Sequence, residues 1–523
     1  MKLPLMFPGR SDTAMIVVIA GLSLTALVRP SLAAQTGGMP PAATEIRIIL
    51  SDRAQLEDLT SLVSIEDVRG LEVRAVATAD QLERLHAAGY SWQSLPVTKT
   101  ASVTMCPQGW ETDLERTFTC YPTYQQYTLL LQGYAAQHPD LCRLMDLGVG
   151  NNVAAPHHLW ALVVTDNPDL DEDEPEVLLT SSMHGDETTG FILMLRLIDE
   201  LLTGYGEDPG LTALVNTTEI WINPLANPDG AYHGGDSDLS GAIRSYTTPE
   251  GTDSGVDPNR NFPDPRFGDH PDSRPWWPET QAMMALADAR SFALSVNFHD
   301  GVEVVNYPWD TWERHHPDDA WFQAISRCWA DLAQADSPGG YMTDFDNGIT
   351  NGYDWYPVHG GRQDFMTFFH GSREVTIELS HTKLQPAENL ADLWQWNQRA
   401  LFDFLNHAHE GISGLVTDPD GSPLQATIAV VEHDTAADGS YVFTDPAVGD
   451  YHRLLLPGTY DLRFTAAGYF PLDVGGIAVS DGVATAVDVV LYPRPVRRAG
   501  RRLTPAAAGA SKSLRVDTAP LRR

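Results

Sequence analysis

His184 and Glu187 are three positions apart, and both side chains are of types that bind transition metals. They follow an apolar run at 177–180 that predicts a buried strand, and they precede an apolar run at 191–198 that predicts a helix. Residues three apart on a helical turn lie on one face, so both should reach one ion. An imidazole and a carboxylate suit zinc, and a third protein ligand would leave one position for water. The pair alone also fits an ordinary helix start with favourable acidic residues.

A third ligand is expected at the end of another strand. The apolar segment 292–298 predicts such a strand, and it delivers His299 at its tip. Glu378 lies in a further strand pattern at 373–380, and a carboxylate beside a metal site is the expected general base. Four other histidines compete for the metal, but they lie in polar, loop-like segments where a solvated side chain is expected: His157, His158, His315 and His316.

The segments that must hold these residues alternate between strand and helix. A helical pattern covers 124–138, and strand patterns cover 159–164, 177–180 and 219–223. This alternation predicts an α/β domain at 122–410 with a mixed, mostly parallel sheet flanked by helices. Sites in such sheets gather at the carboxyl ends of the strands, which is where His184 and His299 fall.

Two smaller domains flank this one. Residues 45–97 predict a small α+β module with strands at 46–50 and 71–77 and helices at 53–62 and 79–88. It is either a pro-segment-like, inhibitory unit or a permanently attached accessory domain. Residues 98–121 predict a linker with a cysteine loop, in which Cys106 and Cys120 are the preferred pair among the three pairings that four cysteines allow. Short alternating strands separated by Gly, Pro and Asp turns predict an all-β sandwich at 411–492.

The charge of the chain excludes one class of partner. The 523 residues carry 70 acidic and 34 basic side chains, a net charge of −36, which argues against nucleic-acid binding. Such acidity attracts cationic substrates, or it serves only to solvate the surface.

Residues 1–33 have the basic, apolar and small-residue pattern of a cleaved signal peptide, and 493–523 predict a disordered basic tail. We therefore expect an exported protein, secreted or periplasmic, without stable membrane insertion after signal cleavage.

Several motifs in one order resemble the zinc metallocarboxypeptidases, the family of carboxypeptidase A. The regulatory branch typified by carboxypeptidases N, E and D is the most similar, and in that branch a transthyretin-like β domain follows the catalytic domain, as at 411–492. The resemblance covers about 122–492, and its motifs are His-Gly-Asp-Glu at 184–187, Asn-Pro-Asp-Gly at 227–230, Gly-Val-Asp-Pro-Asn-Arg-Asn-Phe-Pro-Asp at 255–264, and the segments 347–356, 360–365 and 374–378.

The resemblance implies a role for each matching residue. It implies that His184, Glu187 and His299 bind one zinc ion per chain, and that Glu378 is the base that activates the zinc-bound water. Arg244 would stabilise the oxyanion. Asn259 and Arg260 would hold the free C-terminal carboxylate of a peptide, and Tyr356 aligns with a mobile substrate-binding tyrosine. The implied function is an exopeptidase acting on peptide or protein C-termini.

Specificity is expected to depend on Asp310 and Gln363. Asp310 occupies the position of an acid that pairs with basic C-terminal side chains in the regulatory branch, so we predict release of Arg or Lys. The alternative is that Asp310 is an ordinary loop acid. Two departures stand out: the segment 148–156 lacks a Glu-Gly-Arg common in relatives, and Arg362 replaces an apolar residue beside Gln363. An inward-pointing Arg362 would weaken a basic preference.

Two other functions remain open at this stage. The same scaffold also serves cell-wall peptide or amide hydrolases, although Asn259, Arg260 and Tyr356 favour a peptide C-terminus. A non-catalytic binding protein is the second alternative, and it predicts that a zinc ligand or the base is missing. The sequence retains all four of these residues.

Overall fold

The computed structural model describes residues 43–95 and 103–495. The predicted signal peptide at 1–33 and almost all of the predicted tail at 493–523 lie outside these residues. Among the described helices, none is both long enough and apolar enough to span a bilayer.

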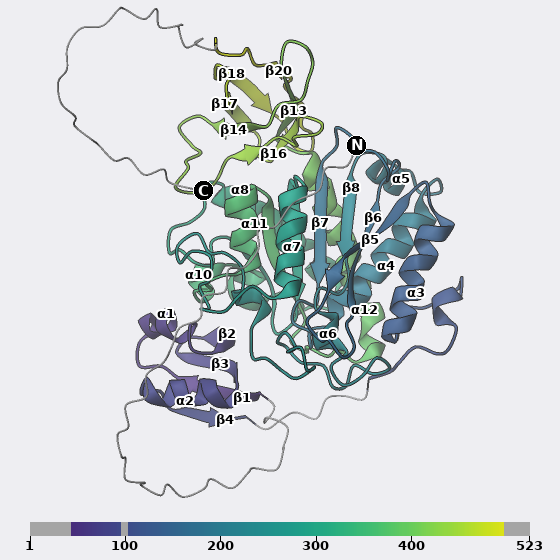
Figure 1. Cartoon of the computed structure of the whole chain (residues 1–523), viewed down its shortest axis with the longest axis vertical. Coiled ribbons are helices and arrows are strands. Elements are labelled where there is room, and N and C mark those ends of the chain that lie inside the picture. Colours follow the sequence, from purple (N-terminus) through teal and green to yellow (C-terminus); the bar gives the residue numbers. More distant parts are fainter. Residues whose placement is uncertain (1–42, 96–102, 496–523) are drawn as a thin grey trace, which may run out of the picture. The chain divides into compact units, whose positions relative to one another are not determined.

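The central domain is built on one mixed sheet with the strand order β11-β10-β12-β9-β7-β8-β6-β5. Figure 1 labels four of its strands, β7, β8, β6 and β5. The four inner strands β12, β9, β7 and β8 run parallel, whereas antiparallel pairs join β10 to β12, β6 to β8 and β5 to β6. The strands are β5 (Cys142–Val149), β6 (His158–Val164), β7 (Glu176–Ser181), β8 (Glu219–Asn223), β9 (Leu294–His299), β10 (Glu303–Tyr307), β11 (Ile349–Asn351) and β12 (Arg373–Leu379).

Helices cover both faces of this sheet. On one face, alternate strand residues such as Leu179 pack with α3 (Tyr124–Gln137), α4 (Thr189–Gly204), α8 (Asp319–Asp336) and α12 (Leu390–Asn406). On the other face, residues such as Leu178 pack with α7 (Pro278–Ala289) and α11 (Arg362–His370). Burial on both faces explains the apolar run Val177–Leu179 in the inner strand β7. The predicted α/β class with a mixed, mostly parallel sheet is therefore confirmed.

Short helices occur in the segments that connect these elements. They are η2 (Trp110–Thr112), α5 (Pro209–Val215), α6 (Pro228–Ala231), η3 (Pro258–Arg260), α9 (Asp344–Asn347), α10 (Gly352–Trp355), η4 (Ala387–Asn389) and η5 (His407–His409). A disulfide joins Cys106 to Cys120 on either side of η2, which confirms the preferred pairing.

The N-terminal module has two strands more than the sequence predicts. Its antiparallel sheet has the order β2-β3-β1-β4, with β1 (Thr44–Ile49), β2 (Ser64–Arg69), β3 (Glu72–Ala77) and β4 (Trp92–Ser94). The helices are η1 (Arg53–Gln55), α1 (Leu56–Leu59) and α2 (Ala79–Ala87), so the helix expected at 53–62 is shorter. Strand β2 has the sequence Ser-Ile-Glu-Asp-Val-Arg. Its three charged side chains interrupt the apolar pattern by which a strand is recognised in a sequence.

The C-terminal domain is all-β, as predicted. One sheet contains β13 (Ile412–Thr417), β16 (Asp450–Arg453), β19 (Thr485–Ala486) and β20 (Val489–Val490). The other contains β14 (Ala426–Val430), β15 (Val442–Phe443), β17 (Gly458–Ala466) and β18 (Leu472–Val479). Side chains from both sheets, including Val416, Ile428 and Phe464, form one apolar core.

A buried ion network joins the β domain to the central domain. Arg453 of β16 contacts Asp318, which precedes α8, with its Nη1 2.9 Å from Asp318 Oδ2. Asp318 also accepts from Arg373 of β12 at 2.7 Å, and Arg453 pairs with Asp434 at 2.8 Å. All four residues are almost fully enclosed, so these charges depend on one another for partners.

Candidate metal and substrate site

His184 and Glu187 lie on one tight turn between β7 and α4. The backbone N–H of Glu187 donates to the carbonyl of His184 at 3.1 Å, and α4 begins only at Thr189. The predicted position between a strand and a helix is therefore confirmed, and a tight turn rather than a turn of helix brings the two side chains to one side. Gly185 allows the turn to approach α6 closely, because a Cβ there would lie 2.4 Å from the nitrogen of Ala231.

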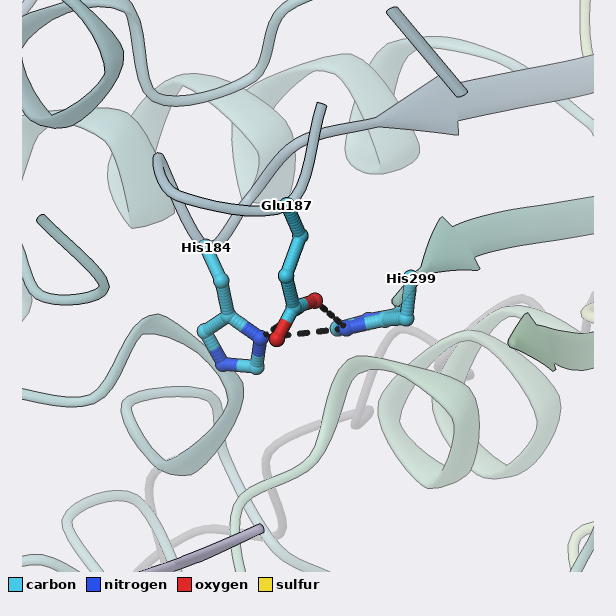
Figure 2. A group of neighbouring side chains, drawn as sticks. All are labelled: His184, Glu187 and His299. Carbon is cyan, nitrogen blue, oxygen red and sulfur yellow. Dashed lines mark hydrogen bonds and ion pairs between the residues drawn. The ribbon is translucent and has the colours of Figure 1, made fainter. Parts of the chain in front are cut away.

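His299 is the last residue of β9 and completes the group. Figure 2 shows its ring meeting the side chains of the His184–Glu187 turn. Glu187 Oε2 lies 3.0 Å from His184 Nδ1 and 2.9 Å from His299 Nδ1, and the two Nδ1 atoms are 3.1 Å apart. One ligand atom from each residue lies within 4.8 Å of the others, and all three residues are buried.

This donor set fits zinc. Two ring nitrogens and a carboxylate oxygen face a common point, which is the His₂Glu set that zinc accepts in open, catalytic sites. The far side of His184 is also held, because its Nε2 lies 2.9 Å from Asp257 Oδ1, and such a second carboxylate fixes a metal-binding imidazole. Burial acts to raise the pKa of Asp257, but Arg244 and His184 outweigh it and hold that pKa well below its ordinary value.

Glu378 lies beside His299 because of strand register. Strands β9 and β12 are parallel neighbours, and Glu378 pairs with His299 in that register. The side chain is half-buried, and its Oε2 atom is buried without a hydrogen bond to any described residue. Burial, reinforced by Glu187, raises the pKa of Glu378 well above its ordinary value, whereas Arg244 and Lys383 act to lower it. A raised pKa suits a carboxylate that accepts a proton.

Arg244 is the buried cation of the site. Its Nη1 donates to Glu187 Oε1 at 2.8 Å, and its Nη2 lies 3.3 Å from Asp257 Oδ2. Burial acts to lower the pKa of Arg244, but the carboxylates of Asp257 and Glu187 raise it overall. Arg244 therefore carries a permanent positive charge directly beside the three candidate ligands.

Arg260 and Tyr356 converge on one backbone carbonyl of the N-terminal module. The Tyr356 hydroxyl donates to the carbonyl of Ile65 in β2 at 3.3 Å, and Arg260 Nη2 lies 3.5 Å from the same oxygen. The Nε of Arg260 is buried and has no hydrogen bond within the described chain. Asn259 precedes Arg260 in η3, and its Oδ1 accepts from the backbone N–H of Arg362 at 2.9 Å. Two side chains expected to bind substrate, those of Arg260 and Tyr356, thus contact an oxygen of the module.

The neighbouring residues of β2 contact the metal-site side chains. The Ser64 hydroxyl bonds to Asp257, and it accepts from Arg244 Nε at 2.8 Å. Glu66 pairs with Lys383, whose Nζ is also 3.8 Å from Glu187 Oε1. The apolar core of the module extends onto Val302, Val304, Trp355, Tyr356 and Val358 of the central domain.

Asp310 lies in a buried cluster of hydrogen-bond acceptors. Its Oδ1 accepts from Asn306 Nδ2 and from Gln363 Nε2, each at 3.1 Å. The opposite amide atoms, Asn306 Oδ1 and Gln363 Oε1, are buried acceptors without a donor among the described residues. Burial raises the pKa of Asp310 to about 7. Gly352 makes room for this cluster, because a Cβ there would lie only 1.7 Å from Asp310 Oδ1.

Arg362 points away from this acceptor cluster. Its guanidinium forms a bidentate pair with Glu374, at 2.9 and 3.0 Å, and its Nη2 also donates to the carbonyl of Val296 in β9 at 3.2 Å. The charge that replaces an apolar residue is thus compensated within the core, and it does not neutralise Asp310.

The four competing histidines lie elsewhere, and two of them are buried rather than solvated. His157 Nδ1 is 2.6 Å from Asp229 Oδ1. His316 Nδ1 accepts from the backbone N–H of Asp318 at 2.9 Å, and burial lowers its pKa to about 3. His158 and His315 are partly exposed partners of Asp146 and Asp319.

The residues predicted to form the site lie near one another, and further residues that the prediction did not include support them. All ten predicted site residues lie at this edge of the sheet or in its adjoining loops. The supports without an assigned role were Asp257, Asn306 and Lys383. Asp257 stands within the quoted 255–264 motif, whereas Asn306 and Lys383 have no local signal because their roles depend on neighbours distant in sequence.

Two family models match the chain. Zinc carboxypeptidase matches residues 127–400, just over half of the chain, and carboxypeptidase regulatory-like domain matches residues 411–492. The catalytic chain of carboxypeptidase N from Homo sapiens is 34% identical over 413 residues, which cover 70% of this chain and 85% of that protein. Carboxypeptidase D from Rattus norvegicus is 34% identical over 393 residues, or 69% of this chain. The match spans only 28% of the length of that longer relative.

A solved structure shares the fold at low identity. Carboxypeptidase A from Helicoverpa armigera has a TM-score of 0.54 and 15% sequence identity, and the match covers 71% of this chain and 98% of that one. At this identity the likeness concerns the fold alone.

Proposed function

Because the chain belongs to the zinc carboxypeptidase family, we propose that it is a metallocarboxypeptidase that hydrolyses the C-terminal peptide bond of peptides and proteins. The observation that carries this proposal is the meeting of His184, Glu187 and His299 at one point, with Glu378 in register beside His299. A non-catalytic binding protein would not need a carboxylate such as Glu378 in register beside a His₂Glu ligand set.

Each residue around the candidate metal position would have its own role in catalysis. His184, Glu187 and His299 would hold zinc, which acts as a Lewis acid: it would polarise the scissile carbonyl and lower the pKa of water. Glu378 takes a proton from the attacking water and later delivers it to the departing amine. Arg244 faces the same space, and its fixed charge stabilises negative charge that develops on the carbonyl oxygen.

Recognition of a free C-terminus would come from Asn259, Arg260 and Tyr356. A carboxylate offers two oxygens to a guanidinium, and this bidentate pairing favours Arg260 as its main partner. Tyr356 and Arg260 already share one oxygen acceptor, the carbonyl of Ile65, which supports their action as one binding unit. Binding the terminal carboxylate restricts cleavage to the last peptide bond and makes the enzyme an exopeptidase.

The acceptor cluster around Asp310 supports release of basic residues. A C-terminal Arg or Lys side chain brings a cation and several N–H donors. Asp310 would pair with the cation, and the unpartnered oxygens of Asn306 and Gln363 would accept the remaining donors. An apolar side chain would leave the oxygens of Asn306 and Gln363 without a donor and Asp310 without a cation, which is costly.

The N-terminal module, at about 45–97, is proposed to inhibit the enzyme. Its strand β2 supplies the Ser64 hydroxyl and the Ile65 carbonyl to residues that must be free to bind substrate. A permanently attached accessory domain is the second interpretation, and it predicts that substrate reaches the site with the module in place. Export guided by residues 1–33, to the periplasm or the exterior, is part of the same proposal.

The function is tested by kcat/KM on matched acyl-dipeptides that end in Arg, Lys, Leu or Glu. The full chain is assayed before and after cleavage at a protease site engineered within 96–102. We expect chelator-sensitive release of Arg and Lys, and Glu378→Gln should reduce it by about 10²–10⁴-fold, as for the loss of a general base. The control is Glu388→Gln, an exposed glutamate on η4.

Other outcomes would separate the alternatives. Cleavage of cell-wall peptides or amides without dependence on a free C-terminal carboxylate would favour the amide-hydrolase function. Zinc binding without any hydrolysis, before or after cleavage within 96–102, would favour the non-catalytic function.

A further inference from the structure

A second group of metal-binding side chains lies outside the residues assigned to catalysis or substrate binding. Cys328 comes from α8, Asp403 from α12 and His407 from η5, and one ligand atom of each lies within 4.8 Å of the others. The Cys328 Sγ is 3.0 Å from Asp403 Oδ2, and His407 Nε2 is 3.4 Å from the same oxygen. A thiol, a carboxylate and an imidazole therefore surround one small volume.

The ring of His407 is oriented as a metal ligand would be. Its Nε2 faces Asp403, and its Nδ1 lies 3.0 Å from Glu410 Oε1 on the opposite side. Both ring nitrogens are buried, yet neither makes a hydrogen bond of good geometry to a residue in the described ranges. A carboxylate behind the outer nitrogen is the usual way to fix the tautomer of a metal-bound imidazole.

Rigid elements hold the three ligands. Asp403 and His407 are four positions apart at the end of α12, so they lie on one face of that helical segment. Helix α8 packs against α12, and the rings of Trp329 and Phe404, each adjacent in sequence to a ligand, meet at 6.0 Å. The ligand residues are only partly buried, so an ion and a water molecule have access from solvent.

We propose that Cys328, Asp403 and His407 form a second zinc site, with water as the fourth ligand and Glu410 supporting His407. Thiolate and imidazole ligands favour zinc over calcium or magnesium, which prefer oxygen. The Cys328 thiol releases its proton to solvent when the ion binds. The ion would link α8 to the end of α12, just before β13 begins the β domain.

The first test counts metal in the full-length protein. We expect two zinc ions per chain in the wild type and one in Cys328→Ser, whereas Cys142→Ser should keep two because that buried cysteine is outside the cluster. In a His299→Ala background, where the catalytic ligand set is broken, one zinc should remain. One zinc per wild-type chain, unchanged by Cys328→Ser, would overturn the proposal and leave an ion-pair cluster.

A spectroscopic test identifies the sulfur ligand directly. Cobalt replaces zinc, and a thiolate bound to cobalt gives a charge-transfer absorption that the His184–Glu187–His299 set cannot give, because it has no sulfur. The absorption should be present in the wild type and in Cys142→Ser, and absent in Cys328→Ser. A cobalt-loaded wild type without this absorption would contradict the assignment.

A third measurement does not depend on the folding of a ligand variant. In full-length Cys142→Ser, Cys328 is the remaining free thiol among the described residues, since Cys106 and Cys120 form a disulfide. Zinc should slow alkylation of Cys328 at least tenfold, and a chelator should restore the rate. Equal alkylation rates with and without zinc would count against the site.

Discussion

The Tyr356 hydroxyl donates to the carbonyl of Ile65, a residue 291 positions earlier in the chain, at 3.3 Å. Arg260 approaches the same oxygen, and Ser64 beside it contacts both Arg244 and Asp257. Strand β2 of the N-terminal module thus contacts the groups that we propose to bind a substrate C-terminus. An oxygen of the module and an oxygen of the substrate carboxylate would compete for the same donors.

Separating the module should therefore raise activity. If it blocks the site in more than about 90% of molecules, its release raises kcat/KM by about tenfold or more. The measurement compares one preparation before and after cleavage at a site engineered within 96–102, followed by dissociation of the module. Equal activity in the two samples would identify the module as a permanent accessory domain.

A substitution in the uncut chain tests the same contact. Glu66 pairs with Lys383 beside Glu187, so Glu66→Ala removes one anchor of β2 and should raise the activity of the uncut protein. Glu83→Ala, which removes an exposed glutamate on α2, is the control and should change nothing. An increase with both variants would point to a general loosening of the module rather than to release of β2.

The buried ion network between the central domain and the β domain should make a large contribution to the free energy of unfolding. Arg453→Met removes a partner of both Asp318 and Asp434 and leaves those carboxylates short of positive charge. We expect the free energy of unfolding to fall by about 3–5 kcal/mol. The exposed bidentate pair Arg463–Asp473 is the control, and Arg463→Met should change the free energy of unfolding very little because water screens this pair. Denaturant unfolding of both variants measures the difference, and equal effects would contradict a special role for the buried network.

The fold was predictable where the pattern is local. Strands β7 and β9 are buried on both faces, so their apolar runs are visible in the sequence, and the ends of these runs locate His184 and His299. Strand β2 was missed because it pairs only with β3 at an edge of its sheet and carries three charged residues. What holds β2 against the site, such as the bond between Ser64 and Asp257, spans 193 positions and leaves no local signal.

The site was predictable to the extent that residue type reveals chemistry. Histidine and glutamate at strand ends indicate metal ligands, whereas Asn306 is an ordinary polar residue in a strand. Its role follows only from its contact with Asp310 and from an oxygen left without a donor. The orientation of the Arg362 side chain could not be predicted from the sequence either, because its partner Glu374 lies on a different element.

Asp310 should determine the preference for basic residues. Asp310→Asn keeps the size of the side chain and removes its charge, so a substrate ending in Arg loses its buried ion-pair partner. The loss of about 3–5 kcal/mol corresponds to a fall in kcat/KM of roughly a hundred-fold or more for Arg, with little change for Leu. Asp392→Asn, which changes an exposed acid on α12, is the control. A similar fall in kcat/KM for Arg and Leu substrates would mean that Asp310 maintains the structure of the site but does not recognise the C-terminal side chain.

The same carboxylate gives the preference a pH dependence. Burial raises the pKa of Asp310 to about 7, so below that pH the group is mostly neutral and offers no ion pair to Arg or Lys. Above that pH the ionised carboxylate attracts the basic side chain. The ratio of kcat/KM for Arg and Leu substrates should therefore rise as pH increases through about 7. Taking the ratio cancels the ionisation of Glu378 and of the metal site, which affect both substrates alike. In Asp310→Asn the ratio should be low and flat from pH about 5 to 9. A wild-type ratio that is equally flat would remove Asp310 from the recognition of basic residues and leave the hydrolytic site unaffected.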